Sequence, residues 1–132
     1  MEWEREVQIA KVDEAQRLVF GVLSEVVKAD GSVVVDSQGD AISTAELEQA
    51  AYEHVVWSRQ ADQMHDEQPI GKLVESFVST PEKRAAMGIG KADDRSVSWW
   101  VGYRVEPEVF AKVKSGALRA FSIGGSAIRV PA

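Results

Sequence analysis

The chain has 132 residues, of which 45% are hydrophobic and 27% charged, and this size and composition predict one folded domain over residues 1–132. Its net charge of −6 opposes binding to a phosphate backbone, so nucleic acid is not expected as a partner. The absence of cysteine excludes disulfides, thiol nucleophiles and cysteine-based zinc sites. No apolar run approaches the ~20 residues that span a bilayer, so no membrane partner is expected.

Strand patterns open the chain. Residues 7–12 alternate weakly between apolar and polar, and residues 17–27 form a longer apolar run that is rich in β-branched side chains. Asp30-Gly31 follows, a pair that tolerates positive φ and is typical of a two-residue hairpin turn. The sequence therefore predicts a β-hairpin that returns through residues 32–35.

A helix is predicted next, over residues 43 to about 59. Ser43 and Glu46 have the spacing of a capping box, in which each side chain binds a free backbone N–H of the first turn. Apolar residues then recur every three or four positions and form one face of the helix. These residues are Leu47, Ala50, Ala51, His54 and Val55.

The second half of the chain alternates strands with short helical patterns. Residues 70–78 and 96–105 predict strands, and the charged, glycine-containing segment 81–95 between them predicts a mobile loop with one helical turn. Pro107 suits the first turn of a helix that ends at Gly116. Residues 118–123 and 127–130 predict two last strands. Because strict βαβ alternation is missing, we expect a mixed β/α fold with an antiparallel or mixed β-barrel surrounded by helices.

The two histidines have different surroundings. His54 lies on the apolar face of the predicted helix, where a core histidine with a hydrogen-bond partner is the commoner outcome. His65 lies in a polar, irregular stretch just before a strand, and an imidazole there can act as a general base near neutral pH. A surface residue is the alternative for His65.

Ser122 is the candidate nucleophile. In a strand it shares its face with Ala120 and Gly124, which leave space beside the hydroxyl. The backbone N–H groups of Ile123, Gly124 and Gly125 could bind an oxyanion, since glycines let a substrate approach closely. The alternative is a strand that simply ends in a Gly-Gly turn.

A serine nucleophile needs a base, and the base is usually held by a third group. Glu75 and Asp66 are the candidates. Glu75 lies between Val74 and Phe77, which predict a buried strand where a carboxylate needs a partner. A glutamate on an exposed strand face is an equal alternative.

No cofactor or metal is predicted. Asp36 and Asp40 offer too few oxygen ligands for a calcium loop, so we expect a turn there. Gly88-Ile89-Gly90 lacks both the preceding strand and the third glycine of a phosphate-binding loop.

Several segments taken in order resemble the XkdF-type phage serine proteases, relatives of the prohead proteases of tailed phages. Each segment is weak alone, but their order and spacing together are specific, and the likeness covers most of the chain. The segments are VQIAKV (7–12), VDSQGDAIS (35–43), HD (65–66), PIG (69–71), VESF (74–77), WWVG (99–102), VKSG (113–116) and FSIGG (121–125).

The resemblance implies a fold like that of the herpesvirus assemblins, a β-barrel surrounded by helices. It implies cleavage of scaffold and capsid-protein segments, and of the enzyme itself, inside the immature shell in the host cytoplasm. His65 matches the family histidine and Ser122 the family serine, and the likeness to assemblins favours a homodimer.

The third catalytic residue departs from the assemblin pattern. Assemblin-like enzymes use a second histidine after the serine, and none follows Ser122 here. An acid such as Glu75 could fill that role. The third residue could instead lie in a C-terminal part beyond residues 129–132, or the domain could work as a dyad of Ser122 and His65. A catalytically silent scaffold or interaction domain in capsid assembly is the other functional reading, and a β-barrel ligand carrier is a third.

Overall fold

The computed structural model describes residues 4–36, 38–61, 71–117, 120–124 and 127–129. These residues form six strands and three helices, and every segment predicted as a strand in residues 7–27 and 70–130 contains one. In chain order the elements are β1 (Glu4–Asp13), β2 (Leu18–Val27), α1 (Thr44–Ala61), β3 (Gly71–Ser79), α2 (Pro81–Met87), β4 (Val97–Val105), α3 (Pro107–Lys114), β5 (Ala120–Gly124) and β6 (Ala127–Arg129).

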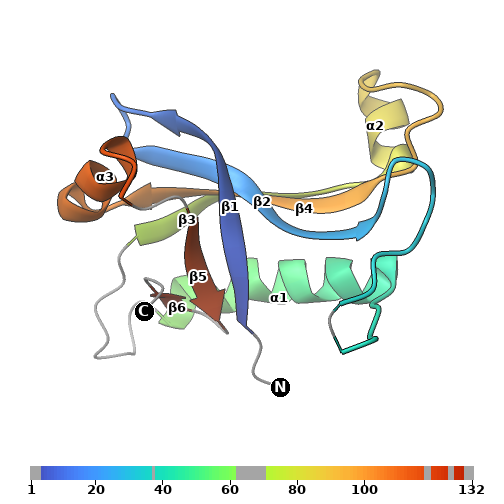
Figure 1. The fold of residues 1–132 in the computed structure, drawn as a ribbon, viewed down its shortest axis with the longest axis horizontal. Helices are drawn as coiled ribbons and strands as arrows, with labels where there is room; N and C mark the ends of the chain where they lie inside the picture. The colour runs from blue at the N-terminus through green and yellow to red at the C-terminus, as the bar shows by residue number, and fades with distance from the viewer. Residues whose placement is uncertain (1–3, 37, 62–70, 118–119, 125–126, 130–132) are drawn as a thin grey trace.

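The strands form one sheet in the order β3-β4-β2-β1-β5-β6, and all of its pairs are antiparallel. Helix α1 runs along one face of the sheet, α2 lies at one end of it and α3 at the other (Figure 1). The predicted mixed β/α class with an antiparallel sheet is confirmed. The predicted barrel is corrected, because the sheet of the described strands stays open between β3 and β6. Likeness to the assemblins stays a prediction.

The core lies between α1 and the central strands. Alternate residues of β4 from Val97 to Val105 are buried, with Trp99 and Tyr103 the largest of them. Since side chains of a strand alternate between faces, these residues point to the same side of the sheet. Leu47 and Ala51 of α1 are buried against that side. The helix face predicted from the apolar periodicity is therefore the face that packs.

The predicted local signals at the start of α1 are confirmed. Ser43 Oγ accepts from Glu46 N at 3.1 Å, and Glu46 Oε1 accepts from Ser43 N at 3.1 Å.

The two turns predicted before this helix are also present. Asp36 Oδ1 accepts from the backbone N–H of Asp40, which makes the predicted turn. The turn at Gly31 is also present, with φ 90°, but the hairpin after it shrinks to a single bridge between Val27 and Val33.

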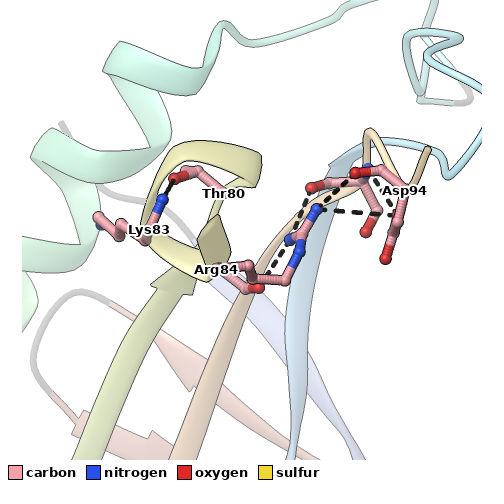
Figure 2. Close-up of polar contacts among 6 residues, drawn as sticks. Thr80, Lys83, Arg84 and Asp94 are labelled. Carbon is pink, nitrogen blue, oxygen red and sulfur yellow. Dashed lines mark hydrogen bonds and ion pairs between the residues drawn. The ribbon is translucent and has the colours of Figure 1, made fainter. Parts of the chain in front are cut away.

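The segment 81–95 is more ordered than predicted. It begins with the seven-residue helix α2, whose first turn is capped by Thr80 Oγ1 accepting from Lys83 N at 3.2 Å (Figure 2). The buried guanidinium of Arg84 then donates to Ser79 Oγ at 2.8 Å, and to the carbonyls of Asp94 at 2.9 Å and Ser96 at 3.0 Å. A loop held by a buried arginine is unlike the mobile loop expected from its charged, glycine-containing sequence.

Candidate functional site

Ser122 lies in the middle of β5, between β1 and β6. Glu6 of β1 pairs with Ser122 on one side, and Arg129 of β6 pairs with it on the other. Directly opposite positions in an antiparallel pair share one face of the sheet. Positions 6, 122 and 129 therefore form one row across three strands, which the sequence could not reveal because it does not show which strands pair.

The predicted oxyanion donors begin inside this sheet. Ile123 pairs with Arg5 and Ile128, and Gly124 continues the register on both sides of β5. Consecutive N–H groups of a strand point to opposite neighbours and are used in its two ladders, so the donor role of Ile123 and Gly124 requires this end of β5 to separate from both β1 and β6. Gly125 lies outside the described residues, and its donor role stays a prediction.

His65 and Asp66 also lie outside the described residues. His65 precedes the first residue of β3, Gly71, by six positions in the sequence. A chain of that length reaches at most about 20 Å. The approach of His65 to Ser122 stays a prediction.

Glu75 lies on β3, at the opposite edge of the sheet from β6. Three strands separate β3 from β5, which corresponds to about 19 Å along a flat sheet. Its carboxylate lies over Gly102 of β4, where an added Cβ would meet Glu75 Oε1 at 2.9 Å. Its role as a third catalytic residue stays a prediction.

Of the two alternatives for Glu75, the exposed strand face is confirmed and the buried strand is wrong. Glu75 is exposed, and the neighbouring side chains of Val74 and Phe77 are 45% and 37% exposed. The reason is that β3 is an edge strand with a bulge between Leu73 and Glu75, so its outer side lacks a neighbouring strand among the described residues.

His54 is a core histidine, as predicted. It is 3% exposed, and its Nε2 lies 2.8 Å from the hydroxyl of Tyr103. Its ring also forms a T-shaped pair with Trp99, at 5.7 Å between centroids. This histidine packs α1 onto β4. Strands β2 and β1 lie between β4 and β5, the strand that carries Ser122.

The clearest electrostatic cluster lies beside α2. The Lys83 ammonium contacts Glu48 Oε2 at 2.9 Å, and it donates to Tyr52 Oη at 3.1 Å and to Val78 O at 3.0 Å. Hydrogen bonds from Lys83 and Tyr52 lower the pKa of Glu48. Burial opposes the charge of Lys83, but its hydrogen bonds to Glu48 and Tyr52 raise its pKa overall. This cluster joins α1, α2 and β3 and has a structural role.

No group of three or more histidine, aspartate or glutamate side chains in the described ranges could hold a metal ion. No helix among these residues is both long and apolar enough to cross a membrane.

Comparison with known proteins decides the family. Residues 6–130 match the family described as "Putative phage serine protease XkdF". The chain belongs to this family. One relative, the phage-like element PBSX protein XkdF of Bacillus subtilis (strain 168), is 30% identical over 113 residues, which is 85% of this chain and 38% of the relative.

A second relative of the same organism, named uncharacterized protein YqbD, is 31% identical over 128 residues, which is 96% of this chain and 37% of the relative. The chain thus spans less than two fifths of the length of these two relatives. No solved structure matches the chain.

Proposed function

We propose that this XkdF-family chain is a serine endopeptidase domain of phage prohead maturation. Its substrates are segments of scaffold and capsid proteins, and its own chain, inside the immature shell in the host cytoplasm. The observation that carries the proposal is the family match over residues 6–130, which includes both Ser122 and His65. The name of the PBSX relative, a phage-like element protein, agrees with a phage setting.

The proposed reaction is acyl transfer to Ser122. His65 takes the hydroxyl proton as Ser122 Oγ attacks a peptide carbonyl, and a tetrahedral oxyanion forms. Backbone N–H groups from Ile123 to Gly125 stabilise this oxyanion. His65 then donates its proton to the leaving amine, and water hydrolyses the acyl-enzyme.

Glu75 separates two forms of the proposal, a triad and a dyad. Its exposed position on the opposite edge strand favours the dyad of Ser122 and His65. We therefore expect Glu75→Gln to keep the rate of peptide hydrolysis within about threefold. A rate of peptide hydrolysis that falls 10²-fold or more in Glu75→Gln, as it does when a catalytic group is removed, would instead assign Glu75 to the triad.

Hydrolysis of a library of quenched fluorescent peptides by the purified chain tests the proposal. We expect cleavage by the wild type and a loss of roughly 10³-fold or more in Ser122→Ala and in His65→Ala. Ser126→Ala, which removes another serine of the same segment, is the matched control and keeps the rate. Unchanged cleavage in Ser122→Ala would refute the assignment, and no cleavage by a folded wild type would favour the silent scaffold.

A further inference from the structure

The outer edge of β3 has features of a surface that binds another protein chain. It ends the described sheet, so residues 71–77 have no strand beside them on that side in the part of the chain that the structure describes. Unpaired edge strands bind further strands unless they are blocked. Among the described residues, Lys83 blocks the end of this edge near α2, because its ammonium donates to Val78 O at 3.0 Å.

Apolar side chains continue from this edge onto α1. Val74 and Phe77 of β3 border a hollow of about 730 Å³ that Val55 of α1 also lines. Tyr52 and Val56, which are 52% and 53% exposed, are four residues apart and therefore lie on the same side of the helix, and Tyr52 is also three residues from Val55. Lys83 contacts both Tyr52 and Val78, which places this side of α1 beside β3. Four exposed large apolar side chains therefore gather along one edge of the molecule.

The bulge in β3 gives this edge a self-complementary charge pattern. Lys72 pairs with Arg104 of β4, and Glu75 pairs with Gly102, two positions along the same strand. Positions two apart on a strand share a face, so the bulge places Lys72 and Glu75 on one face of β3. In a regular strand, residues three apart would lie on opposite faces. Both side chains are exposed, and no ion pair among the described residues involves either of them.

We propose that β3 pairs antiparallel with β3 of a second copy of this chain, about a twofold axis between Leu73 and Val74. In this register Lys72 of each copy lies opposite Glu75 of the other, so two ion pairs form across the axis. Gly71 to Ser76 form the joint ladder. The two α1 helices then lie beneath it on the same side of a continuous sheet, and Tyr52 and Val56 are covered.

This inference deepens the proposed function by naming the surface of a homodimer, and it depends on the proposed function only for the purpose of the dimer. The charge pattern selects the second copy over an unrelated peptide, because both members of each ion pair come from the same strand. Binding of another protein at this edge is the alternative outcome.

Charge reversal with rescue tests the register. Sedimentation equilibrium of the full chain measures the dimer dissociation constant of the wild type, Lys72→Glu, Glu75→Lys and the double reversal K72E/E75K. We expect a wild-type dimer, about tenfold weaker association in each single variant, where like charges meet twice, and recovery to within about threefold in the double variant. Lys91→Glu, the same change at an exposed loop position, is the matched control and leaves association unchanged.

The outcomes that overturn the dimer are independent of catalysis. A monomeric wild type up to high concentration refutes it, and so does a dimer that the single reversals leave intact. Thermal melting verifies that each variant is folded. Peptide hydrolysis is measured on the same samples: an active monomer contradicts only the dimer, whereas an inactive dimer contradicts only the protease.

Discussion

The two halves of the sheet differ in how firmly they are built. Strands β3, β4 and β2 have nine or ten residues, are backed by α1, and include the buried Trp99 and Tyr103. Strands β5 and β6 have only five and three residues, and β5 carries the candidate nucleophile Ser122. Short strands contribute few ladder hydrogen bonds, and binding and catalytic segments are commonly drawn from the parts of a protein with low local stability. The comparison separates a half that stabilises the fold from a half that holds Ser122.

The largest effect is expected in the first half, at Trp99. Its indole is 1% exposed, and its Nε1 donates to Ser76 Oγ of β3 at 2.9 Å. Trp99→Ala should lower the free energy of unfolding by about 3–5 kcal/mol, because it leaves a large cavity under α1. Urea denaturation followed by circular dichroism measures this loss. A cost below about 1 kcal/mol would contradict the view that this half stabilises the domain.

Arg84 should have the next largest effect. Its guanidinium links α2 to the carbonyls of Asp94 and Ser96, and truncation leaves these acceptors without their donor. We expect Arg84→Ala to cost about 2–4 kcal/mol in the same denaturation experiment. Arg84→Lys keeps the charge but loses the planar fork, so it should lie between the wild type and the alanine variant. Equal stability of all three proteins would show that the loop does not need this anchor.

Two glycines test the pairing of β2 with β1, through which the first half of the sheet contacts the second. A Cβ at Gly21 of β2 would lie 1.9 Å from the carbonyl oxygen of Gln8, which belongs to the backbone of β1. At Gly102 it would instead meet the carboxylate of Glu75 at 2.9 Å, an atom that can swing away. We expect Gly21→Ala to cost about 2 kcal/mol and Gly102→Ala less than about 1 kcal/mol.

Hydrogen exchange locates the effect of these two variants. Gly21→Ala should speed amide exchange in β1 and β5, since it pushes β1 away from β2. Gly102→Ala should leave β1 and β5 unchanged. The reverse ranking of the two variants would mean that β1 is not held where its register with β2 places it.

The smallest effect is the pH dependence of the Glu48–Lys83 pair. The pKa of Glu48 is lowered in the folded state by hydrogen bonds from Lys83 and Tyr52. A lowered pKa adds stability that is complete above the ordinary glutamate pKa and is lost as the pH falls through the folded-state value. Because both side chains are partly exposed, the contribution is below about 1 kcal/mol.

Glu48→Gln should remove this part of the acid dependence and leave the rest of the stability curve in place. Thermal melting of the wild type and the variant from neutral to acidic pH measures the difference. A difference between the two proteins that grows as the pH falls would contradict the sign of the pKa shift.

The parts predictable from sequence were the local ones. The capping box at Ser43, the turn at Asp36 and the core role of His54 each depend on residues close in the chain, and the structure has all three. Trp99 and its alternating neighbours on β4 were assigned to a strand for the same reason.

The parts that failed depend on contacts far apart in the sequence. The choice between a buried and an exposed Glu75 stayed open because no local signal shows that β3 is an edge strand. The segment 81–95 was predicted to be a mobile loop because the sequence does not show that Arg84 donates to the carbonyls of Asp94 and Ser96 in the folded chain. Glu6 and Arg129 beside Ser122 were missed because strand pairing cannot be read from one strand at a time.

The most direct test of the account is to find which residue a fluorophosphonate probe modifies. Mass spectrometry of peptides from the labelled wild-type chain should place the probe on Ser122, with labelling absent in Ser122→Ala and strongly reduced in His65→Ala. A probe attached to any other residue, or no attachment to the folded wild type, would contradict the claim that β5 carries the nucleophile of a serine protease.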